Sequence, residues 1–179
     1  MIQTDNSKKR STNFLGGSPT SISSAKDVKD YYDNEGATWS ENYTTRDGKI
    51  ATNPALLRFN VVKKIIEHFD CDNFFDAGCA DGPVLLKLLK MGKTVRGVDF
   101  SSVLVEKGRQ RLADSGYSPD LCHIGDVTNL DVPDDQFDTV LCLGVLPHIC
   151  DLELAVSELS RITKPQGIVI LSFRNDLFD

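Results

Sequence analysis

The 179-residue chain is predicted to fold as one α/β domain, with an open, doubly wound and mostly parallel sheet flanked by helices. From about residue 71 onward, short apolar runs alternate with amphipathic segments of ten or more residues. This alternation is typical of strand–helix–strand units with right-handed crossovers. A second observation is the glycine-rich turn that directly follows the first apolar run and leads into a helix, the geometry of a ligand-binding loop.

Composition narrows the possible partners. The formal net charge is -6, which argues against a nucleic acid or an anionic membrane surface as the partner. We find no apolar run near 18 residues and no signal-peptide pattern, so neither a membrane helix nor secretion is expected. Five cysteines without a CxxC pair predict reduced thiols in a cytoplasmic protein. The three histidines have no metal-ligand spacing with them, so no metal site is expected.

The N-terminal part divides into two segments before the sheet begins. The polar start of the chain lacks periodicity and is expected to be disordered. Val28, Tyr31 and Tyr32 then recur at helical spacing, and Asn53-Pro54 supplies a cap and a first-turn proline for a longer helix. The expected units are a tail over 1–25, a helical segment over 26–70 and the sheet domain over 71–179.

Within the sheet domain, hydrophobic patterning and turn residues separate the elements. Residues 165–167, Pro-Gln-Gly, are expected to form the turn into the last strand. The expected strands cover 73–76, 94–98, 121–124, 137–143 and 168–173, and the expected helices cover 82–91, 102–115 and 151–163.

Four candidate ligand-binding residues stand at or just after the ends of the first four strands. They are Asp76, Asp99, Asp126 and Gly144. Because the carboxyl ends of parallel strands share one edge of the sheet, these residues should lie together at the place where such sheets bind ligands.

The details of this edge favour one kind of nucleoside. A dinucleotide fingerprint requires G-x-G-x-x-G, whereas this loop reads Gly78-x-Ala80-x-Gly82 and ends on proline. An acid at Asp76 would also repel a diphosphate, but it suits an ammonium group. Asp99, after the second strand, is placed to grip a ribose diol. The pattern therefore indicates a nucleoside that carries an amino acid, and it disfavours a nicotinamide oxidoreductase.

Several motifs together resemble the class I S-adenosylmethionine-dependent methyltransferases, a Rossmann-like family, and in particular those that act on small molecules. The resemblance covers residues 70–175 and rests on the glycine loop, Val98-Asp99-Phe100-Ser101, Gly125-Asp126-Val127, Phe137-Asp138-Thr139-Val140 and the segment from Leu159 to Gly167. It implies S-adenosyl-L-methionine as the cofactor and a small-molecule O, N or C acceptor.

The same resemblance assigns roles to individual residues. The segment 26–70 would be a lid over cofactor and acceptor, and His148 would be the general base. The methionine moiety would lie on the loop of Gly78, Cys79, Ala80 and Gly82, with its amino group near Asp76. Its carboxylate would contact Tyr32 or Tyr43 and pair with Arg58. Asp99 would hold the ribose, Phe100, Asp126 and Val127 would hold the adenine, and Leu143 and Gly144 would line the space near the methyl group.

Two features depart from the family pattern. Ala80 replaces a usual glycine and should cost about 1 kcal/mol if its φ is positive. The chain ends after the fifth strand, so we expect a fragment, a naturally short form or a homodimer through an exposed sheet edge. The alternative function is a catalytically silent S-adenosylmethionine-fold module that serves as a binding or partner subunit. Sugar, quinone, polyketide and amine acceptors all remain open.

Overall fold

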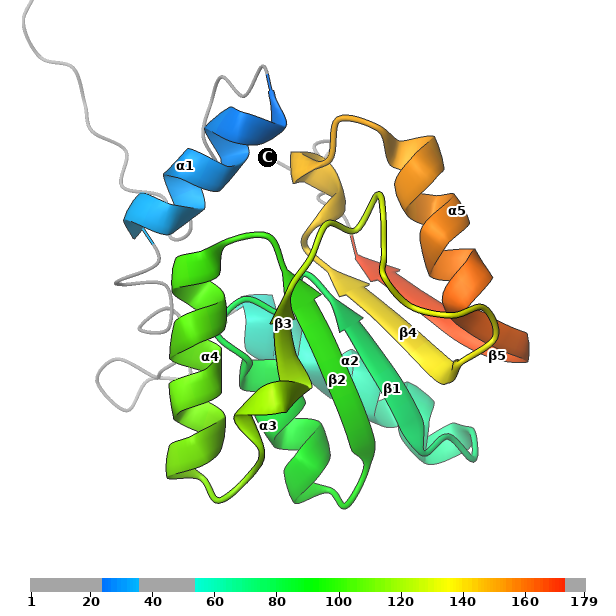
Figure 1. Cartoon of the computed structure of the whole chain (residues 1–179). Helices are drawn as coiled ribbons and strands as arrows, with labels where there is room; N and C mark the ends of the chain where they lie inside the picture. The colour runs from blue at the N-terminus through cyan, green and yellow to red at the C-terminus, as the bar shows by residue number, and fades with distance from the viewer. Residues whose placement is uncertain (1–23, 36–53, 173–179) are drawn as a thin grey trace, which may run out of the picture.

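A computed structural model of the chain describes residues 24–35 and 54–172. Its core is a five-stranded sheet in the order β3-β2-β1-β4-β5, in which every neighbouring pair is parallel (Figure 1). The strands are β1 (Asn73–Ala77), β2 (Thr94–Asp99), β3 (Cys122–Ile124), β4 (Phe137–Leu143) and β5 (Thr163–Ser172). The predicted doubly wound α/β fold is confirmed, and the strand order reverses between β1 and β4, so the site is expected at the carboxyl ends of these strands.

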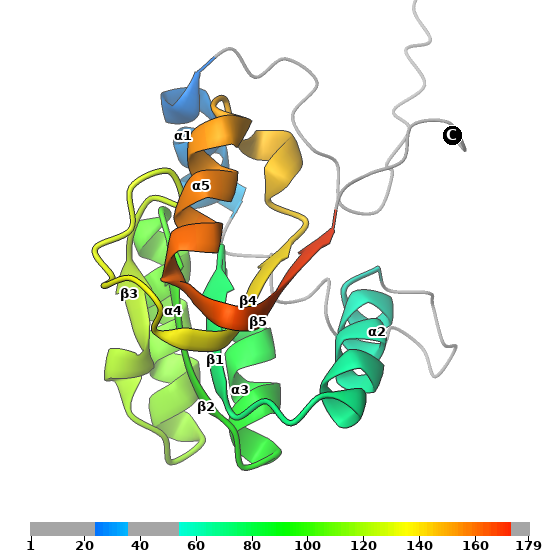
Figure 2. The ribbon, with the colours of Figure 1, turned by 90° about the vertical axis from the view of Figure 1, so that its right-hand side faces the viewer.

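The central strands are buried on both faces, which explains their nearly continuous apolar sequence. Phe74 of β1 and Leu141 of β4 face one side and have no exposed surface, while Phe75 and Val140 face the other. On the first face lie α2 (Pro54–His68), α3 (Pro83–Lys90) and α4 (Ser102–Asp114), and on the second lies α5 (Leu152–Ile162) (Figure 2). The sheet and the helices on its two faces therefore form a three-layer sandwich, with one apolar cluster between each pair of layers.

Local signals start the helices where the sequence predicts. Pro83 stands in the first turn of α3, and the Ser101 hydroxyl caps α4 by accepting a hydrogen bond from the Leu104 N–H at 3.3 Å. The Asp151 carboxylate caps α5 by accepting from the Leu154 N–H at 3.1 Å. These caps fix the turns that lead from the carboxyl end of a strand into the next helix, and these turns carry the candidate site.

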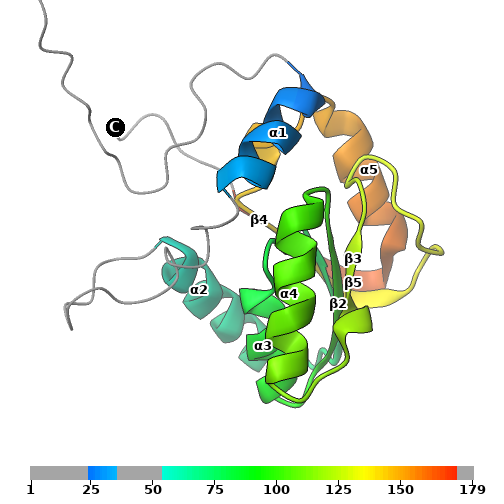
Figure 3. The same cartoon turned by 60° about the vertical axis from the view of Figure 1, so that its left-hand side comes forward.

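Helix α1 (Ala25–Glu35) lies across the carboxyl edge of the sheet (Figure 3). Val28 and Tyr32 bury its apolar face together with Leu104 of α4, which confirms the predicted amphipathic helix. Residues 1–23 of the expected tail lie outside the described residues, as does Tyr43, the alternative candidate for the methionine carboxylate. None of the helices in the described part of the chain is long and apolar enough to cross a membrane.

The prediction that the turn at 165–167 precedes the last strand is wrong, because these residues lie inside the strand. Strand β5 begins directly after α5 at Thr163, and its pairing with β4 passes from Phe137↔Thr163 to Thr139↔Ile168. The extra residues form an irregularity inside the strand, where Gln166 has a φ of 67°. The Thr163 hydroxyl donates to the Leu159 carbonyl at 2.6 Å and holds the start of the strand against the end of α5.

Two short 3-10 turns also differ from the expectation. Leu121, expected in a strand, belongs to η2 (Pro119–Leu121), whose proline and serine cap favour a turn. The loop after β4 forms η3 (Leu146–His148), which directs the His148 side chain toward α1.

Candidate active site

The loop after β1 is a tight turn that depends on left-handed backbone. Gly78, Ala80 and Gly82 have φ values of 82°, 48° and 74°. The Gly78 and Cys79 N–H groups donate to the Val98 carbonyl at 2.8 and 2.9 Å, which ties the loop to β2. The predicted turn is confirmed, and the positive φ of Ala80 meets the condition under which its methyl group costs stability.

Gly78 also allows a close approach between two loops. A Cβ at this position would overlap the Val145 side chain from the loop after β4. The two loops that follow β1 and β4 therefore touch at the switch point, and the Gly78 position joins them.

Asp99 is held by backbone groups on both sides. One carboxylate oxygen, Oδ2, accepts from the Ala80 N–H at 2.9 Å, and Oδ1 accepts from the Ser101 N–H at 3.0 Å. The residue is 6% exposed. Each oxygen of a carboxylate can accept two hydrogen bonds, so Asp99 keeps acceptor capacity for two further donors such as a pair of ribose hydroxyls.

Asp76 and Asp99 form a buried acidic pair at the carboxyl edge of the sheet. Burial raises the pKa of Asp76 to about 7, and the charge of Asp99 adds to the rise. Burial also raises the pKa of Asp99 to about 6, although its two backbone hydrogen bonds act in the opposite direction. Among the described residues, no lysine or arginine makes an ion pair with either acid. A ligand with positive charge and hydrogen-bond donors would therefore relieve an unfavourable charge arrangement.

Cys79 does not present its side chain to this edge. Its sulfur lies 3.6 Å from the sulfur of Cys122 on β3, and both thiols are buried below the loop. The hydrogen bond to Cys122 and burial raise the pKa of Cys79 well above its ordinary value. Cys79 is thus an unreactive packing group, and only its backbone can contribute to ligand binding.

The adenine-side candidates occupy the edge near β2 and β3. Phe100 is half-buried next to Asp99, and the Val127 side chain packs into the core, so its backbone N–H is the group available there. The Asp126 carboxylate is exposed and accepts from the Thr128 N–H and hydroxyl at 2.9 and 2.8 Å through one oxygen. Asp126 therefore stands at the predicted edge with its second oxygen free of these bonds.

The opposite side of the site is formed by the end of β4 and by α2. Gly144 has a φ of 78°, and an added Cβ would stand 2.5 Å from Nη1 of Arg58. The fold thus brings the Arg58 guanidinium of α2 against the Leu143–Gly144 turn, a proximity that the sequence did not predict. Arg58 makes no ion pair with any described residue, which leaves its charge available to an anionic group.

Helix α1 closes the site from above through two contacts. The Tyr32 hydroxyl lies 3.0 Å from Nε2 of His148, and the Tyr32 ring meets Phe100 edge-to-face at 6.3 Å. One residue further, the Asp33 carboxylate accepts a hydrogen bond from the Ser101 hydroxyl. Asp33 was not predicted as a site residue, and no local signal distinguishes it from the other acids of this helix.

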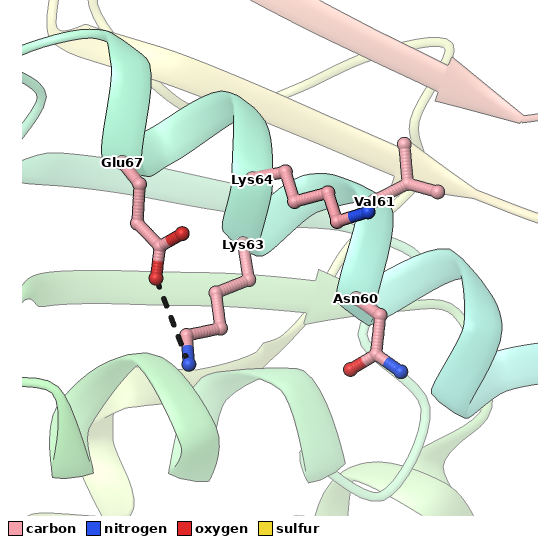
Figure 4. Close-up of a pocket in the computed structure, with 5 residues that line it drawn as sticks. All are labelled: Asn60, Val61, Lys63, Lys64 and Glu67. Atoms are coloured by element: carbon pink, nitrogen blue, oxygen red, sulfur yellow. Dashed lines mark ion pairs between the residues drawn. The ribbon is translucent and has the colours of Figure 1, made fainter.

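One other feature of the surface does not belong to this site. A hollow along α2 is lined by residues of that one helix, with an ion pair of 3.6 Å between Lys63 and Glu67 (Figure 4). Its position away from the acids gives it no part in the candidate chemistry. Within residues 24–35 and 54–172, no group of three or more histidine, cysteine or acidic side chains is arranged to hold a metal ion.

Curated relatives and a family model that match this chain are methyltransferases. A family model described as a methyltransferase domain matches residues 75–171. The chain is 27% identical over 133 residues to the ubiquinone biosynthesis O-methyltransferase of Bartonella bacilliformis, which covers 69% of this chain and 53% of that protein. It is 30% identical over 101 residues to the malonyl-(acyl-carrier protein) O-methyltransferase of Serratia marcescens, covering 56% and 38% respectively. The chain spans about half the length of the curated relatives it matches, or less.

Solved structures confirm the fold. Magnesium protoporphyrin IX methyltransferase from Synechocystis, solved with bound S-adenosylmethionine, superposes with a TM-score of 0.69 at 23% identity, covering 89% of this chain and 80% of that one. The 4+2 cyclase SpnF superposes with a TM-score of 0.67 at 21% identity, covering 83% and 59%. Identities this low establish a shared architecture, which by itself does not determine the reaction.

Proposed function

Because the chain belongs to the methyltransferase domain family, we propose that it transfers the methyl group of S-adenosyl-L-methionine to a small-molecule acceptor. The observation that carries this proposal is the buried acidic pair of Asp76 and Asp99 at the carboxyl edge of the sheet, which has no cationic partner among the described residues. A ligand with an ammonium group, a sulfonium and a ribose diol offers both the positive charge and the donors that this pair lacks.

The chain's own residues fit that cofactor better than a dinucleotide. The left-handed loop from Gly78 through Ala80 to Gly82 would lie below the methionine moiety, with Cys79 contributing its backbone. Asp76 would face the ammonium group, and Asp99 would accept from the ribose hydroxyls. A diphosphate in the same place would meet two buried carboxylates and be repelled.

The remaining roles follow from position along the edge. Phe100, the Asp126 carboxylate and the Val127 N–H would bind the adenine, while Leu143 and Gly144 would line the space around the methyl group. Arg58, which has no acidic partner among the described residues, would pair with the methionine carboxylate, and Tyr32 stands at the same opening of the site.

The cofactor supplies a methyl group already activated by the positive charge of the sulfonium. The protein must align the acceptor with it and, for a hydroxyl or amine, remove a proton. His148 is the proposed base: burial lowers the pKa of its imidazole, so the ring is neutral and able to accept a proton near pH 7. The names of the curated relatives favour an oxygen acceptor.

A second candidate function is a silent S-adenosylmethionine-fold module. The neighbour SpnF is named as a cyclase, so the fold does accommodate activities other than methyl transfer. The Ala80 methyl group in the cofactor loop also favours this alternative, since it narrows the space below the methionine moiety.

Location and assembly belong to the same proposal. All five cysteines are free thiols, which suits a cytoplasmic location. Within the described residues β5 pairs only with β4, and pairing of two copies along this edge stays a prediction, to be checked by the mass of the particle in solution.

Calorimetric titration with S-adenosylhomocysteine tests the proposed function. Wild-type protein should bind it, and NAD should give no heat. Asp99→Ala removes the acceptor of two ribose hydrogen bonds, each worth about 1.5–3 kcal/mol with a charged group, so affinity should fall by at least about 100-fold. Asp131→Ala, which removes an exposed acid, is the matched control and should bind normally.

Circular dichroism separates loss of binding from loss of fold in Asp99→Ala, because this variant also leaves the Ala80 and Ser101 N–H groups unpaired. A folded wild-type protein that binds no S-adenosylhomocysteine would contradict the proposal and favour the partner module.

A further inference from the structure

A buried ion pair that the proposed function does not use ties the glycine loop after β1 to α4. Nη2 of Arg111 donates to Oδ2 of Asp81, the residue between Ala80 and Gly82. The Asp81 side chain is 1% exposed, and its other oxygen, Oδ1, is buried without a hydrogen-bond partner in the described part of the chain. Asp81 therefore faces α4 and has almost no surface left for a ligand.

Helix α4 approaches the loop closely at the same place. Gly108 lies one turn before Arg111 on the same face of the helix, and an added Cβ there would stand 3.3 Å from the Asp81 carbonyl carbon. This separation is shorter than an optimal contact between two carbon atoms. The absence of a side chain at Gly108 thus lets the helix backbone support the loop, while Arg111 binds the loop's own acid.

Asp81 and Arg111 complete a closed ring of contacts around the ribose acid. Oδ2 of Asp99 accepts from the Ala80 N–H at 2.9 Å, and Oδ1 accepts from the Ser101 N–H at 3.0 Å. Ser101 caps α4, so this helix holds Asp99 directly on one side and, through Asp81 and the loop, on the other. The position of the Ala80 N–H relative to the carboxylate therefore depends on both ends of α4.

The loop has few preferences of its own that would hold this shape. Gly78, Ala80 and Gly82 all have positive φ, a region in which alanine is strained and which glycine leaves as readily as it enters. The Gly78 and Cys79 N–H groups bond to β2 and hold the first half of the loop. The Asp81 side chain adds a tie to α4 in the second half, between two left-handed residues.

The ion pair is poorly built for stability alone. Burying a carboxylate is costly, and an ion pair offsets this cost only where further hydrogen bonds satisfy the remaining oxygen. Here Oδ1 of Asp81 has no partner among the described residues, and the Arg111 side chain is still 33% exposed. Removing both charges together should therefore change the stability of the domain little, so the consequence of the pair lies in the geometry of the loop.

We propose that Asp81 and Arg111 are positioning residues that keep the glycine loop pre-organised, with the Ala80 N–H fixed on Asp99, before the cofactor binds. This inference rests on the proposed methyltransferase function. Neither side chain contacts the ligand, and both act through Ala80 and Asp99. A loop that is already ordered lowers the cost of binding, so its loss weakens affinity in a protein that stays folded.

Hydrogen exchange of the Ala80 amide, measured by NMR in the ligand-free protein, tests the positioning directly. The double variant Asp81→Ala/Arg111→Met removes both charges without leaving a buried polar group unpaired. Its Ala80 amide should exchange at least about tenfold faster than in the wild type, whereas Leu88 in α3 and Leu112 in α4 should keep their rates. Asp81→Ala alone, whose arginine partner can turn to solvent, carries the same prediction and serves if the double variant does not fold.

Calorimetry with S-adenosylhomocysteine gives the functional readout. The double variant should bind about tenfold more weakly than the wild type, while its Tm stays within about 5 °C. Arg109→Met is the matched control, because this arginine lies on the same helix and is 35% exposed, but it donates to the Cys122 carbonyl of β3 and not to the loop. The control should keep both the wild-type Kd and the wild-type exchange rate of Ala80.

The outcomes separate positioning from general support of the fold. Faster exchange at Leu88 and Leu112 together with Ala80, or an equal loss of affinity in Arg109→Met, overturns the proposal, because either result marks a loosening of the whole domain. An unchanged Ala80 exchange rate, or a Kd within about threefold of the wild type, overturns it too. No binding by the folded wild type contradicts the proposed function, and the Ala80 exchange rate then decides by itself whether the ion pair orders the loop.

Discussion

Replacing Asp76 by asparagine should make the cofactor-free protein more stable at alkaline pH, although it removes a proposed ligand-binding group. Asp76 is 2% exposed, and its carboxyl has no cationic partner among the described residues. Its pKa rises from 3.8 in the unfolded chain to about 7 in the folded protein, mainly through burial. At 1.36 kcal/mol per pH unit, this difference costs about 4 kcal/mol of folding free energy once the group is ionised in both states.

The pH dependence gives this prediction a definite sign. Because the folded protein holds the proton more tightly, the stability from protonation is complete below about pH 4 and is lost as the pH rises through about 7. At pH 5 the cost is only about 2 kcal/mol. The advantage of Asp76→Asn over the wild type should therefore grow by about 2–3 kcal/mol between pH 5 and pH 8.

Urea unfolding at pH 5, 6.5 and 8 measures this advantage. Taking the difference between the two proteins removes the contributions of acids with lowered pKa, such as Asp33 and Asp138. Asp131→Asn, at an exposed position, should show no such trend. The reasoning is refuted if the Asp76→Asn advantage does not change with pH, or if the variant is the less stable protein at pH 8. Its affinity for S-adenosylhomocysteine should fall by about tenfold, since one charge facing the ammonium group is lost.

Three further substitutions test the geometry of the site. Gly78→Ala should destabilise the protein by about 3 kcal/mol, because the new methyl group overlaps Val145. Gly92 has a similar φ and open space around it, so Gly92→Ala should cost only about 1 kcal/mol. Thermal unfolding of the two variants compares these costs. Ala80→Gly should stabilise the protein by about 1 kcal/mol and tighten S-adenosylhomocysteine binding by calorimetry, and an unchanged Tm would contradict the strain assigned to its φ of 48°. Arg58→Gln should weaken that binding by about tenfold or more if the guanidinium pairs with the methionine carboxylate, while Lys63→Gln on the exposed face of α2 should bind normally.

Short stretches of this sequence predict the order of strands and helices. Apolar runs of strand length, the Pro83 first turn and the Ser101 cap act over a few residues, so they can be identified one after another along the chain. The placement of Asp76 and Asp99 at one edge follows from the same pattern, because parallel strands connected by helices all present their carboxyl ends together. The start of the last strand is not where residues 165–167 predict it. Pairing with β4 begins already at Thr163 and continues beyond the irregularity at these residues.

Contacts between distant segments were decided only by the tertiary structure. Tyr32 meets His148, Asp33 meets Ser101, and Arg58 covers Gly144 because α1 and α2 pack where the strand order reverses, and no local pattern states which side chains will face each other there. The same holds for the pKa values of the acidic pair, which depend on how completely the surrounding layers exclude water. The sequence by itself therefore determined the fold class and the cofactor edge through local preferences, whereas the partner of His148 and the charge state of the site depend on packing across the whole domain.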